Sequence, residues 1–361
     1  MSDGLHVATR KGLFLLERGA RGWEIARISF LGDPVSIVLD DRRDRTLYAG
    51  LALGHFGVKL HRSADRGRSW TEVRAPAFPA AVEGAEEAPA VQLVWSLAAG
   101  GPGEPGALWA GTLPAALFRS ADRGEAWTLV RPLWDRPERK QWMGGGYDHP
   151  GLHSICVDPR DPRRLVCGIS SGGVWATADG GETWETRARG MYAEYMPPER
   201  REDPNVQDPH HLAQCPAAPD VIWAQHHNGV FRTTDGARRW IEVTAVRPSK
   251  FGFAVAVHPT DPRTAWFVPA VKDERRVPVD GRLVVARTRD GGQSFEVLSQ
   301  GLPEAQAYDL VYRHGLDVDE TGRRLAFGST SGGLWISEDG GDRWQLHPAR
   351  LPPIYQVAFA G

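Results

Sequence analysis

The chain has 361 residues, of which 41% are hydrophobic and 24% charged, a composition typical of a folded protein with a large core. Its 43 basic and 45 acidic residues give a net charge of −2, and this balance, without a basic run, argues against nucleic-acid binding. No stretch approaches the ~20 consecutive apolar residues that a transmembrane helix needs, so no membrane partner is predicted.

The chain enters a strand pattern at its first residues. Strands are predicted over 5–10, 12–17 and 23–27, which form a four-stranded unit that lacks its first strand. Because no basic segment followed by an apolar one precedes them, no signal peptide is predicted and a cytoplasmic location is expected. The three cysteines, Cys156, Cys167 and Cys215, are expected to be buried and reduced.

One short phrase recurs along the rest of the chain. It first runs from Ser63 to Trp70 as Ser-Ala-Asp-Arg-Gly-Arg-Ser-Trp, and five related copies begin at Ser120, Thr177, Thr233, Thr288 and Ser337. Its aspartates are Asp65, Asp122, Asp179, Asp235, Asp290 and Asp339, which stand 57, 57, 56, 55 and 49 residues apart. This near-constant spacing indicates a repeat architecture.

The recurring phrase has the chemistry of a turn. Asp can accept hydrogen bonds from backbone amides that follow it, and Gly supplies a positive φ. Each copy follows one apolar strand and precedes another that begins with an aromatic residue, so we expect hairpin turns with the aromatic ring at the base. The phrase resembles the S/T-x-D-x-G-x-x-W consensus of BNR/Asp-box repeats, found in sialidases, some glucanases, sortilin-type receptors and photosystem II assembly factors. The resemblance implies that these aspartates are structural.

Each full unit is predicted to form four antiparallel strands. In the unit around the third copy, the predicted strands are 152–157, 164–169, 173–177 and 183–187. Six such units follow the N-terminal partial unit, and one more strand is predicted over 354–360. Pairing this strand with the N-terminal partial unit completes a seventh sheet and removes exposed edges. The sequence therefore predicts an all-β fold, a single seven-bladed β-propeller of four-stranded antiparallel blades over residues 1–361.

The long insertions are predicted to lie opposite the Asp turns. In antiparallel units, the second-to-third loops and the crossovers between units lie at the end away from the third-to-fourth turns. Four long insertions fall there, at 75–90, 131–150, 187–209 and 269–281. Long loops in a compact fold are usually functional or disordered, and aromatic residues in two of these loops favour function.

Histidines gather at the same predicted end. They occur where crossovers enter the units and in the second-to-third loops, with Asp and Tyr residues around them. The predicted catalytic residues are His153, His211, His227, Asp148 and Asp208. The predicted substrate-binding residues are His55, Tyr147, Tyr195, His210, His226, Tyr308 and His314.

Three interpretations of this histidine grouping stay open. Imidazole titrates near neutral pH, so the group could perform acid–base chemistry on a small polar or sugar-like molecule, as an enzyme of the hydrolase or lyase type. Imidazole is also a common metal ligand, so His153, His211 and His227 could bind a divalent metal ion. The third interpretation is that these residues only line a hydrated channel mouth.

An alternative function is a non-catalytic binding or assembly scaffold that uses the same end for a protein partner, as the resemblance to assembly factors implies. Sialidase activity is not expected. Arg27-Ile28 is followed by Ser29, where the sialidase motif has Pro, and an arginine triad cannot be assigned.

Overall fold

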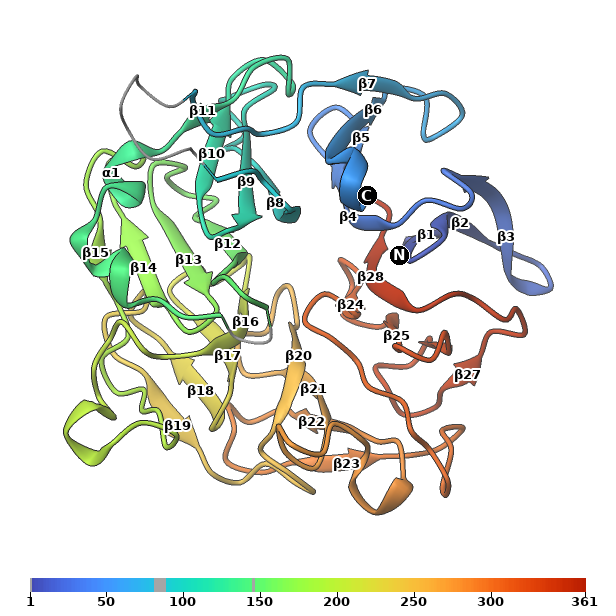
Figure 1. Ribbon diagram of the computed structural model, residues 1–361. Helices are drawn as coiled ribbons and strands as arrows, with labels where there is room; N and C mark the ends of the chain where they lie inside the picture. The colour runs from blue at the N-terminus through green and yellow to red at the C-terminus, as the bar shows by residue number, and fades with distance from the viewer. Residues whose placement is uncertain (1, 81–88, 145–146) are drawn as a thin grey trace. The chain divides into compact units, whose positions relative to one another are not determined.

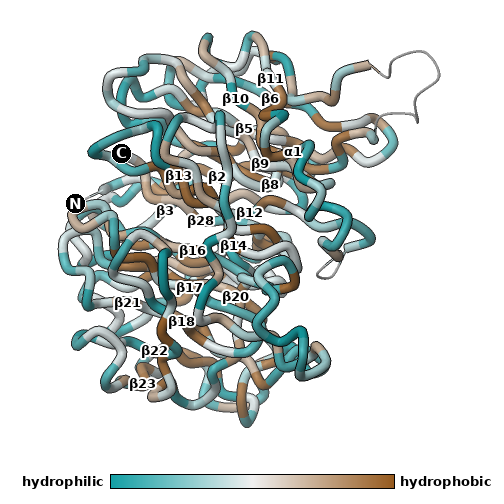
Figure 2. Tube along the Cα trace, turned by 90° about the vertical axis from the view of Figure 1, so that its left-hand side faces the viewer, coloured by the Kyte–Doolittle hydropathy of each residue, from teal (hydrophilic) through white to brown (hydrophobic). Residues whose placement is uncertain are grey.

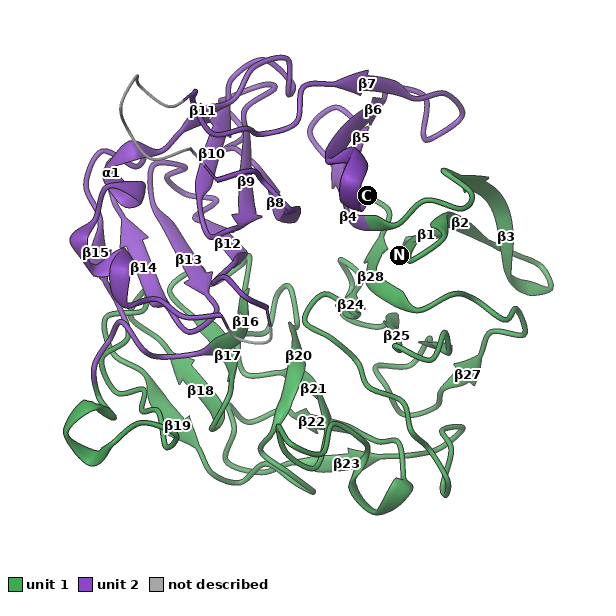
Figure 3. Cartoon of the chain, in the orientation of Figure 1, with its two compact units in different colours: residues 1–35, 188–202, 209–361 green, residues 36–187, 203–208 purple. Residues whose placement is uncertain are grey.

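A computed structural model describes residues 2–80, 89–144 and 147–361 (Figure 1). Parts of the predicted insertions, 81–88 and 145–146, therefore lie outside the described residues. The chain forms two compact units, coloured separately in Figure 3. Unit 1 comprises residues 1–35, 188–202 and 209–361, and unit 2 comprises 36–187 and 203–208.

Unit 1 contains four antiparallel sheets of four strands each. The first joins the two ends of the chain, in the order β28 (Ile354–Phe359), β1 (Gly4–Thr9), β2 (Gly12–Gly19) and β3 (Gly22–Ser29). The second consists of β16 (Pro209–Gln214), β17 (Ile222–His226), β18 (Gly229–Thr233) and β19 (Ile241–Val243). The third consists of β20 (Gly252–Val257), β21 (Ala265–Pro269), β22 (Val285–Thr288) and β23 (Glu296–Leu298). The fourth consists of β24 (Leu316–Val318), β25 (Leu325–Gly328), β26 (Leu334–Ser337) and β27 (Gln345–Leu346).

Unit 2 contains three sheets of the same kind. The first consists of β4 (Val35–Asp41), β5 (Thr46–Ala52), β6 (Val58–Ser63) and β7 (Thr71–Val73). The second consists of β8 (Leu93–Ala99), β9 (Leu108–Leu113), β10 (Leu117–Ser120) and β11 (Thr128–Leu129). The third consists of β12 (Leu152–Val157), β13 (Leu165–Ile169), β14 (Gly173–Thr177) and β15 (Glu185–Thr186).

The predicted fold class is confirmed. There are seven four-stranded antiparallel sheets, and β28 pairs with β1, with Val357 opposite Val7. The predicted strand bounds agree to within one or two residues at most ends. The fourth strand of the unit around the third Asp phrase is shorter than predicted: β15 covers Glu185–Thr186, whereas the prediction was 183–187. The Asp turn includes residues 183 and 184, of which Trp184 is the aromatic one, so β15 begins only after them.

Short helices occur only in connections within the described part of the chain. They are η1 (Gly54–Phe56), α1 (Arg131–Trp134), η2 (Pro137–Gln141), η3 (Pro198–Arg200) and η4 (Val279–Gly281). Three of the four predicted insertions thus contain a helical turn. None of the helices in residues 2–80, 89–144 and 147–361 has the length and apolar character needed to cross a bilayer.

The core of each unit lies between neighbouring sheets. Figure 2 shows hydrophobic residues concentrated along the strands and hydrophilic residues mainly in the loops. In unit 1, Trp266 and Val268 of β21 pack in one cluster with Leu325 and Phe327 of β25. Their alternation along the strands places one face of each strand in this layer. The predicted burial of all three cysteines is also confirmed.

The six Asp phrases form the same hydrogen-bonded turn. In each, the Ser or Thr hydroxyl at the end of the third strand donates to Oδ1 of the aspartate, at 2.7–2.9 Å. The residue after the aspartate has a positive φ throughout. It is Gly in four copies, but Arg66 and Arg123 adopt φ of 60° in the other two. The predicted structural turn is therefore present, with strain where Arg replaces Gly.

We expect Asp290→Ala to lower the melting temperature by several degrees at pH 7. Oδ1 and Oδ2 of Asp290 accept hydrogen bonds from the hydroxyl and N–H of Ser294 and the N–H of Gln293, and these bonds depress the pKa of Asp290. Because the folded-state pKa is depressed, this stabilisation is complete above the ordinary pKa near ~3.9 and is lost as the pH falls towards the folded-state value.

Thermal unfolding followed by circular dichroism at several pH values checks this expectation. The difference between wild type and Asp290→Ala should narrow as the pH falls from 7 to about 2. Asp290→Asn keeps an acceptor oxygen and should be intermediate at pH 7. An Asp290→Ala protein as stable as wild type at pH 7 would contradict the structural role of the turn.

Candidate functional site

The segment 188–202 of unit 1 packs closely against the sheet formed by β16–β19. Gly190 has φ of 95°, and a Cβ there would lie 2.2 Å from the carbonyl oxygen of Trp240, so this approach requires glycine. Further along, the N–H of Glu194 donates to Oδ1 of Asn228 at 2.8 Å. These contacts hold the segment beside the β17–β18 turn.

Two carboxylates at this place share one ammonium group. Nζ of Lys250 lies 3.5 Å from Oε1 of Glu194 and 3.5 Å from Oε1 of Glu242 on β19. Burial lowers the pKa of Lys250, but its interactions with Tyr192, Glu194 and Glu242 outweigh this effect, so the pKa lies above its ordinary value. Lys250 is therefore a cation at neutral pH and holds the two carboxylates near each other.

Tyr192 is hydrogen-bonded to one member of this carboxylate pair. Its hydroxyl donates a hydrogen bond to Oε1 of Glu242 at 2.7 Å. Burial, and then the bond to Glu242, raises the pKa of Tyr192, so the phenol keeps its proton and stays a donor at neutral pH. The ring of Tyr192 also lies 6.0 Å from Nζ of Lys250, within range of a cation–π contact.

Three predicted site residues meet next to the carboxylate pair. The ring of His227 lies 4.9 Å from that of Tyr195 and 5.5 Å from that of His210. Nδ1 of His210 lies 2.6 Å from the carbonyl oxygen of Gly252. A carbonyl only accepts hydrogen bonds, so Nδ1 of His210 carries the proton and Nε2 is the ligand atom it can offer.

The two histidines of this group also have ligand atoms that lie close together. His210 and His227 each offer a ligand atom within 4.8 Å of the other. Of the three predicted metal ligands, His227 lies here, His211 contacts a different histidine of unit 1, and His153 belongs to unit 2.

His211 and His314 form a second pair in unit 1, with ring centroids 5.1 Å apart. Burial lowers the pKa of His211 well below its ordinary value, and the positive charges of His314 and Arg313 lower it further. His211 is therefore neutral at pH 7, and its immediate surroundings are electropositive.

Two other predicted residues of unit 1 lie apart from these groups. His226 is fully buried, and its Nδ1 accepts the N–H of Asn228 at 3.1 Å, so it shapes the β17–β18 turn. Tyr308 is 73% exposed, in the connection that leads to β24.

The remaining predicted residues belong to unit 2. His153 is fully buried: its Nδ1 lies 2.9 Å from Oγ of Ser154, and its ring meets that of Trp95 edge-on. Tyr147, which is half exposed, contacts the same Trp95 ring at 5.3 Å. His153 and Tyr147 therefore share one tryptophan in the structure.

Three further predicted residues of unit 2 differ in their exposure. Asp208 is buried and accepts the N–H of Ser171 at 2.9 Å, a contact that holds the β13–β14 turn. Asp148 and His55 are exposed. These exposures do not test the predicted catalytic and binding roles, which stay predictions.

The prediction did not include Glu242, Lys250, Phe251 or Phe253. One signal could have found one of them: Phe253 is the second residue of the innermost strand β20, as His210 is of β16. Glu242 carries no such signal, because it lies on an outer strand that the sequence marks only as polar.

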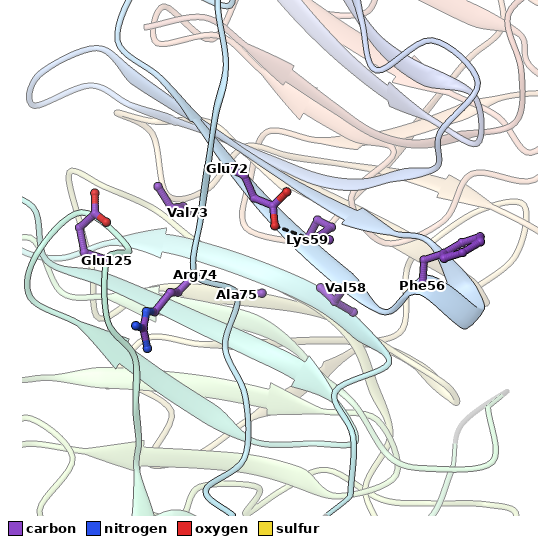
Figure 4. Close-up of a pocket in the computed structure, with 8 residues that line it drawn as sticks. All are labelled: Phe56, Val58, Lys59, Glu72, Val73, Arg74, Ala75 and Glu125. Atoms are coloured by element: carbon purple, nitrogen blue, oxygen red, sulfur yellow. Dashed lines mark hydrogen bonds and ion pairs between the residues drawn. The ribbon is translucent and has the colours of Figure 1, made fainter.

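Unit 2 also contains a pocket of about 550 Å³ beside β6 and β7 (Figure 4). Its lining includes Phe56, which is 79% exposed, and the ion pair of Lys59 with Glu72 at 2.5 Å. A second pocket of about 470 Å³ shares Val58 and Ala75 with it. The rest of the second lining consists of Ala, Pro, Phe and Val side chains.

No family model matches the chain. Its sequence is 29% identical over 154 residues, or 42% of the chain, to a probable oligoxyloglucan-reducing end-specific xyloglucanase of Neosartorya fischeri. The matched part is 17% of that protein's length. The chain therefore corresponds to a small part of this curated relative.

Solved structures resemble the chain over nearly its whole length. The GH74 xyloglucanase of Xanthomonas campestris superposes with a TM-score of 0.62 at 17% identity, covering 96% of this chain and 52% of the enzyme. YCF48 bound to D1 peptide superposes with a TM-score of 0.54 at 15% identity, covering 87% of this chain and 82% of YCF48. Together with the seven sheets, these likenesses define the class of protein as a seven-bladed β-propeller.

Proposed function

We propose that this protein binds an oligosaccharide at the loops of unit 1 and hydrolyses a glycosidic bond with Glu194 and Glu242. The observation that carries the proposal is the pair of carboxylates held by one ammonium group, Nζ of Lys250, at 3.5 Å each. The sequence similarity to a xyloglucanase and the fold likeness to a GH74 enzyme support the reaction class.

The distances to Lys250 allow a carboxyl separation suited to this chemistry. Two oxygens that each lie 3.5 Å from one nitrogen are no more than about 7 Å apart, a limit that includes the separation of about 5–5.5 Å found in retaining glycosidases. One carboxyl group protonates the leaving oxygen, and the other activates water or attacks the anomeric carbon. Tyr195 and His227 lie beside the pair and offer ring faces on which a sugar can stack.

An assay of reducing-end release from a panel of soluble polysaccharides, including xyloglucan, tests the proposal. We expect release from one class of linkage. Binding without release, detected by affinity electrophoresis in the same panel, would restrict the function to carbohydrate binding. Neither binding nor release from any member of the panel would contradict the proposal.

A second candidate function is peptide binding by unit 2. Its support is the exposed Phe56 beside two adjoining pockets, together with a fold neighbour, YCF48, that is bound to a peptide. An extended peptide could place apolar side chains in both pockets. Selection from a displayed peptide library tests this function: Phe56→Ala should weaken a selected peptide about tenfold or more, while Glu194→Gln should not.

A further inference from the structure

An arginine directly precedes the Ser or Thr that begins the turn in four of the six Asp phrases. These arginines are Arg62, Arg119, Arg232 and Arg287. The guanidinium groups of three of them lie 2.7–3.0 Å from a carboxylate oxygen, and these are called the paired sites here. Arg232 is the exception: within the described parts of the chain it forms no ion pair, and its buried Nε makes no hydrogen bond.

The repeat explains why Arg232 lacks a carboxylate partner. In two paired sites, the carboxylate belongs to the third residue after the aspartate of the next Asp turn along the chain. This residue is Glu125 for the first arginine, at 3.0 Å, and Asp342 for the last, at 2.7 Å. The corresponding residue for Arg232 is Gln293, whose amide carries no charge. The sequence thus keeps the arginine and replaces its partner.

Arg232 still lies against the next Asp turn, as the arginines of those two paired sites do. Their Nη1 atoms donate to the carbonyl oxygen of the residue after the turn aspartate, at 3.3 Å for Arg123 and 2.7 Å for Gly340. The equivalent residue for Arg232 is Gly291, where a Cβ would lie 2.8 Å from Nη1 of Arg232. The guanidinium carbon also lies 5.3 Å from the ring centroid of Trp223, a cation–π contact that orients the side chain.

A second arginine adds positive charge here. The carbonyl oxygen of Arg263 accepts the N–H of Gly291 at 2.9 Å, so the β20–β21 turn lies beside the Asp turn that Arg232 contacts. Burial lowers the pKa of Arg232, and the charge of Arg263 lowers it further. Asp261 acts in the opposite direction, but its carboxylate accepts the N–H of Arg263 and the hydroxyl of Thr264, at 3.0 and 2.6 Å. Two cations therefore share one carboxylate that is already bound within its own turn.

One paired site shows how the protein balances two arginines. Arg287 and Arg289 both approach the carboxylates of Glu296 and Asp342, at 2.7 Å for Arg287 and 3.7 Å for Arg289. The side chain of Asp342 is 55% exposed although that of Arg287 is only 3% exposed, so this carboxylate lies at the surface. The equivalent position beside Arg232 is therefore expected to be open to ions from solution.

We propose that Arg232 and Arg263 bind a phosphate group beside Gly291, in the position that a carboxylate of the protein fills in the paired sites. A phosphate monoester carries a charge of about −1.5 to −2 at pH 7, so one such group can balance two guanidinium groups. The N–H groups of arginine also match phosphate oxygens in geometry. This inference goes beyond the proposed function and does not depend on it, because Glu194 and Glu242 take no part.

Calorimetric titration at constant ionic strength tests the inference with three probes: inorganic phosphate, methyl phosphate and acetate. Inorganic phosphate should bind at least about tenfold more tightly than acetate, because it has a second charge and more acceptor oxygens. Methyl phosphate identifies the source of the group. If it binds as tightly as inorganic phosphate, the site accepts a phosphate attached to a larger molecule; if only inorganic phosphate binds, the ligand is the free ion.

Gln293→Glu restores the carboxylate that the paired sites have. It should weaken phosphate at least about tenfold, because the new side chain occupies the position of the ligand. It should also raise the melting temperature in phosphate-free buffer by about 1 °C, since Arg232 gains a partner. Gln345→Glu is the matched control: Gln345 is exposed on β27, so this variant adds the same charge elsewhere in unit 1 and should leave the affinity unchanged.

Two further variants remove the proposed cations. Arg232→Met and Arg263→Gln should each weaken phosphate about tenfold, because each removes charge-assisted hydrogen bonds. Methionine keeps an apolar side chain next to Trp223. Arg263 is exposed, so Arg263→Gln keeps the test valid if the Arg232→Met protein does not fold.

Phosphate that binds the wild-type protein no more tightly than acetate would overturn the inference. Wild-type affinity in Gln293→Glu and Arg263→Gln would overturn it too, because phosphate would then bind elsewhere. An equal loss of affinity in Gln345→Glu would show a general charge effect and would also overturn it. None of these titrations uses a carbohydrate, so their failure leaves the proposed function untouched, and inactivity on the polysaccharide panel leaves this inference untouched.

Discussion

Glu242→Gln is expected to lower kcat for oligosaccharide hydrolysis by about 100-fold or more, and Glu194→Gln by a similar factor, because each removes one of the two groups that transfer a proton or attack the sugar. Glutamine has nearly the same shape, so the bond from Tyr192 and the position of Lys250 should persist. Initial rates at saturating substrate measure the effect, with thermal unfolding as a check on folding.

Glu304→Gln is the matched control. Glu304 is exposed in unit 1, and its replacement should leave kcat unchanged. Azide distinguishes the two roles. It should restore turnover of an activated aryl glycoside both in the variant that lacks the acid–base group and in the variant that lacks the nucleophile. The anomer of the product then identifies which of the two groups each variant lacks. Wild-type rates in both glutamate variants would show that the carboxylate pair is not the catalytic pair.

Val357→Asp is expected to destabilise the protein by more than about 4 kcal/mol, enough to prevent folding at 37 °C. Val357 lies on β28 opposite Val7 of β1, is 2% exposed, and packs with Leu5, Phe14 and Ile354. A carboxylate there would be buried among aliphatic groups, in the one sheet that joins the two ends of the chain. Urea denaturation, or the soluble yield if the protein cannot be purified, measures the effect.

The same substitution at an exposed strand position provides the comparison. Val297 on β23 is 47% exposed, and Val297→Asp should change stability by no more than about 0.5 kcal/mol. Similar losses in both variants would mean that the charge, rather than disruption of the β28–β1 sheet, causes the effect. A stable Val357→Asp protein would contradict the role of this pairing.

Much of the fold could be predicted because its signals are local. The bounds of β14 were predicted to the residue, and the Asp turns were identified from eight-residue phrases whose hydrogen bonds span four residues or fewer. The pairing of β28 with β1 is a long-range contact, but it followed from counting strands and from the need to cover exposed edges.

The candidate site was predictable only in part. The repeat register placed His210, His211 and His314 near the starts of innermost strands, where the structure has them. The same register treated His153 as the equivalent of His314. In the structure, His153 is buried beside Trp95 in unit 2, whereas His314 contacts His211 in unit 1.

The sequence by itself determined the number of sheets, their strands and their turns, because repetition and alternation express contacts within a few residues. The pairing of the chain ends followed from the strand count and the need to cover exposed edges. Only the tertiary structure decided which polar side chains meet. Glu194 and Lys250 are 56 residues apart in the sequence. Phe253 lies on β20, whereas Arg313, which contacts it, lies in the connection that leads to β24. Such contacts depend on how loops of unequal length pack on the strands, and no period in the sequence encodes that packing.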